Sequence, residues 1–372
     1  MNWQSIAASA DATKLFAVNA RWNAASQAIY RSTNSGATWD TAPAPSEPWW
    51  FISCSADGNK LLATSSKVFL SYDSGNTWNQ TSDTNIWGGA CASSADGSRL
   101  LVASGGVFVS TNSGTNWSYS SWPSPPWRAA ASSADGSTFV LAGSFTTYHY
   151  VTGQVAISTN SGVTWWPADL PECMGWTCAA VSADEAKLAA AAENACEWSP
   201  WIYISTNRGI TWHPTSAPQT RWGSVDFSSD GTMLLAADVG EFINGKLIHY
   251  STNMGDTWTS AGTLSTNWSS LVCSADGNKL VAAAGSGMSP TGLIYTWQST
   301  PSPKLTITPS ASGLLISWIV PSMPFVLQEN ADLNTPDWTA VPMTPILNLT
   351  NLHHEVTVPL SGTNRFFRLQ RL

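Results

Sequence analysis

The chain has 372 residues, a formal net charge of −8, and only 11% charged residues. Its lysines and arginines are scattered, which argues against nucleic acid or an anionic membrane surface as a partner. No apolar run approaches the ~20 residues that cross a bilayer, so we expect no membrane insertion. Tryptophan is abundant, with 22 copies set among many small residues.

A short phrase recurs seven times: a tryptophan, about seven small residues, a Ser-Ala-Asp-Gly-like turn, and then Leu and Ala. The tryptophans are Trp3, Trp49, Trp87, Trp127, Trp176, Trp222 and Trp268, and the turn aspartates are Asp11, Asp57, Asp96, Asp135, Asp184, Asp230 and Asp276. Short strands that repeat every ~40–50 residues are typical of a radial β-propeller. We therefore predict an all-β fold with a seven-bladed propeller over residues 1–302.

A second motif follows six of these turns and reads Ser-Thr-Asn-x-Gly-x-Thr-Trp or a close variant. Its copies are residues 32–39, 71–78, 110–117, 158–165, 205–212 and 251–258. The motif resembles the Asp-box, or BNR, repeat of sialidases, xyloglucanases, sortilin-type receptors and a photosystem II assembly factor. Only Asp73 keeps the usual acid, but Asn can equally accept backbone N–H groups and fix the turn. The resemblance covers residues 1–300 and implies a propeller whose boxes are structural.

The second repeat shows the expected strands, at residues 51–55, 60–64, 67–71 and from about 77. The seventh repeat lacks a recognisable box. Three possibilities remain open for its blade: residues 304–309 complete it, a strand before residue 1 has been trimmed, or it has three strands. We favour the first.

From residue 303 the pattern changes to short alternating segments. The run Phe325-Val-Leu-Gln, Trp338, and the terminal Phe366-Phe-Arg-Leu resemble a small fibronectin-like unit at the end of many secreted proteins of planctomycete and verrucomicrobial bacteria. The resemblance implies a small β-sandwich-like module over residues 303–372, serving as a stalk or sorting unit. We expect a secreted or cell-surface protein whose export signal is absent from this chain.

The seven repeated tryptophans have two possible roles, as wedges between blades or as an aromatic platform in an open bowl. Trp22 and Trp198 lie in nearby loops, and Arg128 and Arg221 each stand next to a ring tryptophan. Flat aromatic faces bind sugars and organic cations, and a face with few charges suits neutral glycans. We therefore predict a monomeric binding protein that stacks a glycan or similar small ligand on this ring, without a cofactor.

Two alternatives remain. A glycan-cleaving enzyme, either a glycoside hydrolase or a polysaccharide lyase, would use Asp226 as one carboxylate. A hydrolase needs a second carboxylate nearby, for which the candidates are Glu172, Glu197, Asp238 and Glu241. A scaffold would instead bind another protein, as the photosystem II factor that the chain resembles does.

The six cysteines divide into two groups. Cys173 and Cys196 lie in loops that should meet on one face, so we predict a disulfide between them. The other four fall on innermost strands and are expected to be small buried side chains. No Cys/His spacing suggests a metal site.

Overall fold

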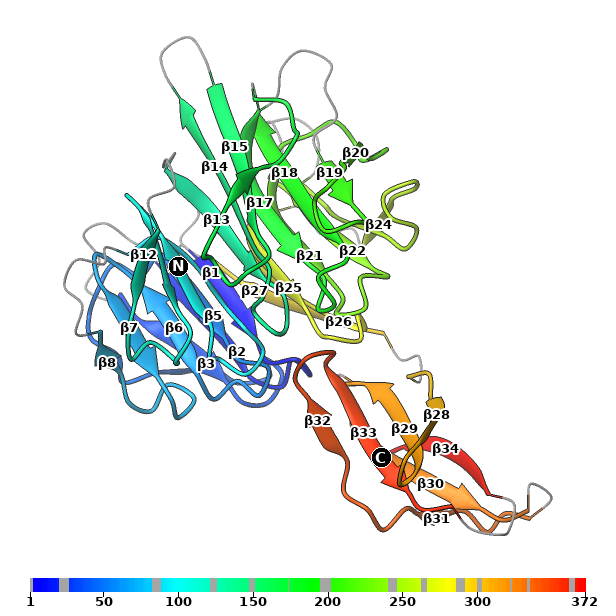
Figure 1. Cartoon of the computed structure of the whole chain (residues 1–372). Coiled ribbons are helices and arrows are strands. Elements are labelled where there is room, and N and C mark those ends of the chain that lie inside the picture. The colour runs from blue at the N-terminus through cyan, green and yellow to red at the C-terminus, as the bar shows by residue number, and fades with distance from the viewer. Residues whose placement is uncertain are drawn as a thin grey trace.

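The computed structural model describes residues 3–19, 27–81, 88–120, 126–146, 151–172, 174–194, 202–239, 246–261, 266–285, 292–299, 303–321, 323–332, 335–360 and 365–372. These residues form β-strands and turns, and they include no helix that could cross a membrane. Figure 1 shows a ring of sheets around an axis, with a smaller pair of sheets beside one of its faces.

The first four sheets follow one another along the chain, each with four antiparallel strands. They comprise β1 (Trp3–Ala8), β2 (Leu15–Asn19), β3 (Ile29–Ser32) and β4 (Asp40–Thr41); β5 (Phe51–Cys54), β6 (Leu61–Thr64), β7 (Val68–Ser71) and β8 (Asn79–Gln80); β9 (Ala90–Ser93), β10 (Leu100–Ala103), β11 (Val107–Ser110) and β12 (Ser118–Ser120); and β13 (Trp127–Ser132), β14 (Phe139–Thr146), β15 (Val151–Ser158) and β16 (Trp166–Pro167).

Three more sheets continue the series. They comprise β17 (Gly175–Val181), β18 (Leu188–Asn194), β19 (Ile202–Ser205) and β20 (His213–Pro214); β21 (Trp222–Phe227), β22 (Leu234–Asp238), β23 (Ile248–Ser251) and β24 (Thr259–Ala261); and β25 (Trp268–Cys273), β26 (Lys279–Ala284) and β27 (Ile294–Gln298). The first strand of each sheet contacts the first strand of the next, and β25 contacts β1, so the sheets close into a ring of blades.

The turns after the first strands form a hub of backbone hydrogen bonds. In each turn the residue before the aspartate donates its N–H to the carbonyl of its counterpart in the next blade, over 2.7–3.2 Å. The donors in order are Ala10, Ala56, Ala95, Ala134, Ala183, Ser229 and Ala275, and Ala275 donates to Ala10. The turn aspartates stay local: Asp57 accepts from the Ser55 hydroxyl and the Asn59 N–H. The repeated turn phrase therefore encodes the centre of the ring.

The box turns have the geometry that their sequence predicts. Asn160 Oδ1 accepts the N–H of Thr164 at 2.9 Å, and its Nδ2 donates to the Thr164 hydroxyl at 2.8 Å. Asp73 accepts both the N–H and the hydroxyl of Thr77. The Thr hydroxyl is thus an acceptor beside Asn and a donor beside Asp, which explains why either residue can fix the box turn. Gly162 takes a positive φ of 81°, as expected.

The seventh blade has three strands among the described residues, β25, β26 and β27. Our preferred assignment of residues 304–309 to this blade was wrong. That segment forms β28 (Thr306–Ser310), which pairs with β29 (Gly313–Ile319) instead. A two-residue turn links β28 to β29, a shorter connection than the one from β27, so a hairpin with β29 is the local pairing.

The C-terminal residues form two further sheets, ordered β28-β29-β33-β32 and β31-β30-β34. The remaining strands are β30 (Phe325–Asn330), β31 (Thr339–Ala340), β32 (Ile346–Asn348), β33 (His353–Val358) and β34 (Phe366–Arg371). Ile316, Trp318, Leu327 and Val356 are buried between them. The separate folding of residues 303–372 remains a prediction.

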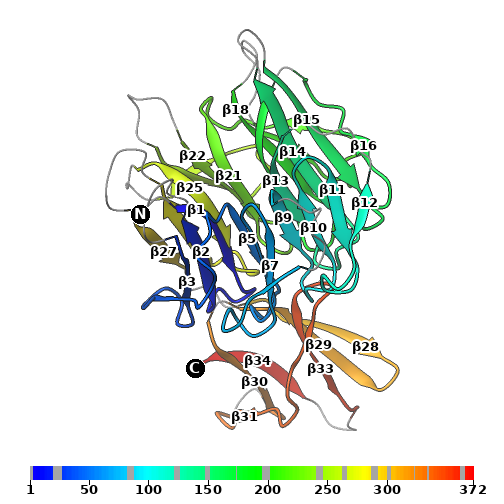
Figure 2. The ribbon, with the colours of Figure 1, turned by 90° about the vertical axis from the view of Figure 1, so that its left-hand side faces the viewer.

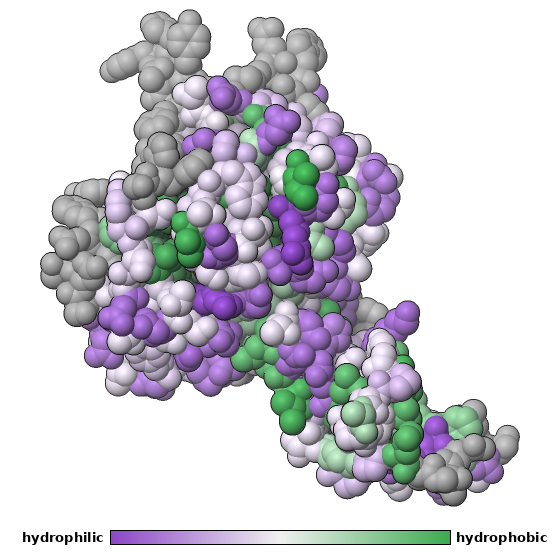
Figure 3. All heavy atoms as spheres, in the orientation of Figure 1, coloured by the Kyte–Doolittle hydropathy of each residue, from purple (hydrophilic) through white to green (hydrophobic). Residues whose placement is uncertain are grey.

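This C-terminal module lies against the hub. Val320 packs on Ala10 and Ala275, with Leu347 and Leu352 alongside. Figure 3 shows apolar side chains gathered where the module meets the propeller. The contact therefore covers part of the face formed by the turn phrases.

Candidate functional site

Two cavities lie along the propeller axis. The upper one, about 320 Å³, is lined by residues along the inner strands, and the lower one, about 240 Å³, by the ends of those strands, the turns that follow them and Leu352 of the C-terminal module. The structure thus places a side chain of the module at the hub end of the axis. The upper cavity is the candidate site, because two of the predicted site residues, Arg128 and Asp226, line it.

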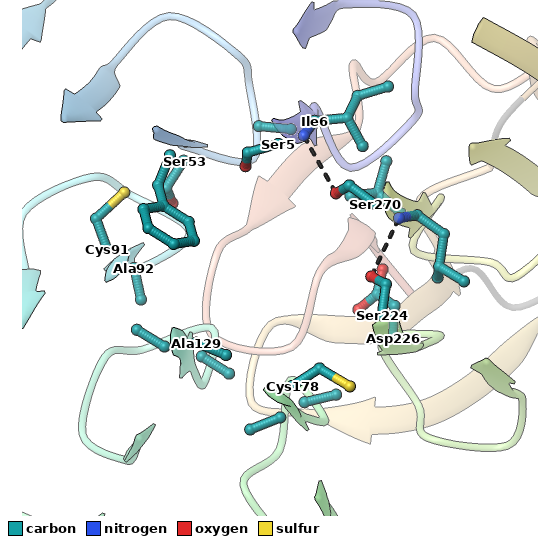
Figure 4. A pocket seen from close by; sticks show the side chains of 18 of the residues that line it. Ser5, Ile6, Ser53, Cys91, Ala92, Ala129, Cys178, Ser224, Asp226 and Ser270 are labelled. Carbon is teal, nitrogen blue, oxygen red and sulfur yellow. Dashed lines mark hydrogen bonds between the residues drawn. The ribbon is translucent and has the colours of Figure 1, made fainter. Parts of the chain in front are cut away.

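The upper cavity has a lining of small side chains. Figure 4 shows Ser53, Ala92, Ala129 and Cys178 on successive inner strands, arranged around a common space. Seven strands crowd together near the axis, and this crowding favours Ser, Ala and Cys there. The cavity is therefore narrow, and only a slender part of a ligand could enter it.

Several cavity hydroxyls are already used to join blades. Ser224 Oγ accepts the N–H of Leu271 at 3.1 Å, and Ser270 Oγ accepts the N–H of Ile6 at 3.2 Å (Figure 4). These bonds flank the three-stranded seventh blade on both sides. They join the seventh blade to its two neighbours, and they leave those serine lone pairs less available to a ligand.

Asp226, the predicted catalytic carboxylate, lies deep on β21 and lines both cavities. Its Oδ1 accepts the N–H of Phe227 at 2.9 Å, and its Oδ2 accepts the N–H of Cys273 at 2.8 Å. Burial raises the pKa of Asp226 to about 6, although these two hydrogen bonds oppose the shift. Both oxygens therefore already bind backbone amides.

The proposed partner carboxylates are not beside Asp226. Among the described residues that line the upper cavity, Asp226 is the only carboxylate. Asp238 instead accepts the Thr220 hydroxyl at 2.6 Å. Glu172 does not line the cavity, and Glu197 and Glu241 lie outside the described residues. The described lining of the upper cavity thus holds no second carboxylate to pair with Asp226 in glycoside cleavage.

The ring tryptophans pack between blades. Trp3, Trp49, Trp127, Trp176, Trp222 and Trp268 are each at most 5% exposed. The predicted open aromatic platform is therefore not formed by these six rings, and the wedge alternative describes them. Each first strand begins beside the preceding blade, so its tryptophan is covered there; Trp49, for example, lies in one core cluster with Phe16 and Val18 of the first blade.

An aromatic partner from the third strand completes this packing. Trp3 meets Tyr30 edge-on at 5.2 Å between ring centroids, and Trp49 meets Phe69 in the same way at 5.2 Å. Trp176 with Tyr203 and Trp268 with Tyr295 repeat the arrangement. The sequence carries a signal for this packing, an aromatic residue at the second position of the third strand in each of these four blades.

Arg128 lies at the mouth of the upper cavity, directly after Trp127 on β13. Its side chain is 47% exposed, and Nη1 lies 3.8 Å from Glu193 Oε2. It is the only cation among the described residues that line this cavity. Arg221, also predicted, is partly buried, does not line the cavity, and accepts the Val239 N–H through its carbonyl.

Several predicted residues lie outside the described residues: Trp22, Trp87, Trp198, Cys173 and Cys196. The disulfide between Cys173 and Cys196 therefore remains a prediction. Cys54, Cys91, Cys178 and Cys273 are free thiols on innermost strands, and burial raises the pKa of each. In the described part of the chain, no cluster of His, Cys, Asp or Glu could hold a metal ion.

No protein-family model matches the chain, and no curated protein matches its sequence. Solved structures share its fold. The chain resembles YCF48 bound to D1 peptide, with a TM-score of 0.58 at 14% identity over 81% of this chain and 94% of that one. The fold is a β-propeller.

Two further propellers are similar. The GH74 xyloglucanase from Xanthomonas campestris has a TM-score of 0.58 at 13% identity, over 86% of this chain and 58% of that one. Hydrazine synthase from Kuenenia stuttgartiensis has a TM-score of 0.59 at 16% identity, over 79% of this chain and 95% of that one. Such low identities establish the fold alone, because propellers carry many functions.

Proposed function

We propose that this propeller is a non-catalytic binding protein that holds the C-terminal carboxylate of a partner polypeptide at Arg128. The observation that carries the proposal is Arg128, the one cation among the described residues that line this narrow cavity, half exposed and 3.8 Å from Glu193. A guanidinium fork matches a carboxylate in two parallel hydrogen bonds.

The shape of the cavity favours the end of a chain over a flat sugar face. A volume of about 320 Å³ admits one or two residues. A glycan bound by stacking has less support, because the six described ring tryptophans are buried. YCF48, a propeller of similar fold, is bound to a peptide in its solved structure, and a protein partner for this chain is our proposal by analogy. Location outside the cell remains part of the proposal.

The test measures fluorescence anisotropy of labelled peptides whose last four residues are randomised. Each pool is made with a free C-terminal carboxylate and, as its pair, with a C-terminal amide. We expect the free-acid pool to bind and the amide pool to bind at least about tenfold more weakly, the loss of one charge-assisted contact.

Arg128→Gln should weaken the free-acid pool to the same degree. Arg208→Gln is the matched control, because it removes an exposed arginine of a box turn, which pairs with Glu185 and does not line the cavity. Equal binding of acid and amide pools would overturn the proposal. Saturable binding of neutral oligosaccharides would restore the glycan-binding alternative, and turnover of a glycan would restore the enzyme.

A further inference from the structure

The outer edge of the seventh blade differs from that of the other six. Each of the other blades has a fourth strand on its third strand, whereas β27 pairs only with β26 among the described residues. Trp297 is consequently 52% exposed and Leu293 is 52% exposed. Figure 2 shows β27 at the outer margin of the propeller, beside the first blade.

The register of the blades shows which backbone groups this edge presents. Leu293 O accepts from Ala284 N–H, and Ser299 N–H donates to Asn278 O, so these odd-numbered positions face β26. Because backbone groups alternate along a strand, Ile294 and Thr296 direct theirs outward. In the first blade, the residue equivalent to Ile294 is Ile29, whose carbonyl accepts the N–H of Ala42.

The other six blades show what covers such an edge. Each fourth strand comes from a four-residue stretch with the pattern Trp-x-x-(Ala, Thr or Ser), at residues 39–42, 78–81, 117–120, 165–168, 212–215 and 258–261. In four blades the final small residue donates its N–H to a carbonyl of the third strand, and in three of these that carbonyl belongs to the strand's first residue. One recognition pattern is thus repeated within the molecule.

The space beside β27 also has a second wall. Ala42 lies beside the box glycine of the second blade, Gly75, and Thr215 lies beside Gly255 of the sixth. The equivalent glycine of the first blade, Gly36, has Thr296 of β27 beside it. An added strand would therefore contact both β27 and the box turn of the first blade.

We propose that β27 accepts an extended segment of another polypeptide, with the pattern Trp-x-x-(Ala, Thr or Ser), as the fourth strand of the seventh blade. The segment runs antiparallel to β27. Its two middle residues pair with Thr296 and Tyr295, and its small residue donates its N–H to the Ile294 carbonyl. This site is separate from the axial cavity and does not depend on Arg128. Main-chain pairing provides affinity, and the tryptophan provides selectivity.

The test uses a labelled peptide with the sequence of residues 255–261, which contains the fourth strand of the sixth blade. We expect saturable binding by fluorescence anisotropy, and at least about tenfold weaker binding when the peptide tryptophan is replaced by alanine. Thr296→Pro removes an outward N–H at a sheet edge, where proline is tolerated, and should abolish binding. Thr296→Val keeps the N–H and should bind like the unchanged protein.

Hydrogen exchange keeps the test independent of whether the proline variant folds. The amides of Ile294 and Thr296 should exchange quickly in the free protein and become protected when the peptide is present. Absence of binding up to about 1 mM peptide would overturn the proposal. So would binding that Thr296→Pro does not weaken and that leaves both amides unprotected.

Discussion

Asp226 Oδ2 accepts the backbone N–H of Cys273 at 2.8 Å, across the boundary between the sixth and seventh blades. In most other blades the equivalent position is alanine, at Ala7, Ala92, Ala131 and Ala180. The carboxylate is therefore an added link beside the three-stranded blade. This link is charged and buried, which makes it sensitive to pH.

Asp226 should make the folded state less stable as pH rises. Its pKa is raised to about 6 in the folded protein, so the folded state binds the proton more tightly than the unfolded chain does. The stability contributed by protonated Asp226 is complete below the ordinary Asp pKa of ~3.9 and is lost as pH approaches 6. The loss is at most about 3 kcal/mol, at ~1.4 kcal/mol per pKa unit.

Urea unfolding at several pH values, compared between the unchanged protein and Asp226→Ala, measures this effect. The unfolding free energy of the unchanged protein, minus that of Asp226→Ala, should decrease from pH 4 to pH 7. A difference that is constant with pH would show that folding does not raise the pKa of Asp226.

The ring tryptophans should contribute to stability through burial. Trp176 is fully buried, so Trp176→Ala should lower the free energy of unfolding by about 3–5 kcal/mol. Trp297 is 52% exposed, and Trp297→Ala should change the free energy of unfolding by less than about 0.5 kcal/mol. Denaturant unfolding measures both, and equal effects would contradict the assignment of Trp176 to the core.

The box turns should tolerate an exchange of Asn for Asp. Asn160→Asp keeps the acceptor for the Thr164 N–H and should change stability by less than about 0.5 kcal/mol at neutral pH. Asn160→Ala removes it and should cost about 1 kcal/mol. Thermal unfolding of the two variants separates these outcomes, and an equal loss in both would argue against the hydrogen-bond account.

The hydroxyl links around the seventh blade should be separately measurable. Ser224→Ala leaves the N–H of buried Leu271 without its acceptor, and Ser270→Ala does the same to buried Ile6. Each should cost about 1–3 kcal/mol. Ser53→Ala is the control, because its hydroxyl makes no hydrogen bond to another described residue and it lies in the same cavity lining. If all three variants unfold at the same temperature, the links contribute nothing to closure.

Local signals explain how much of this structure could be predicted. The Ser-Ala-Asp turns and the boxes are fixed by contacts between residues two to four positions apart, so their sequence predicted blades and turns correctly. The burial of Trp49 depends on Phe16 and Val18 of another repeat, and no spacing within one repeat reports that contact. Residues 304–309 alternate as a fourth strand would, yet β29 is a nearer partner. Arg128 was predicted as a binding residue from its place beside Trp127. That it is the one cation among the described lining residues depends on what all seven inner strands contribute, which one repeat does not reveal.

The hub has a consequence for how the chain folds. The last of its hydrogen bonds joins Ala275 to Ala10, so it cannot form until nearly the whole propeller has been synthesised. Until then, the first blade of a chain still being synthesised lacks its contact with the seventh blade, so that side of it is uncovered. Structures dominated by such distant contacts fold slowly, and their unpaired edges are open to wrong partners in the meantime. The ring can therefore close only after the seventh repeat has been released.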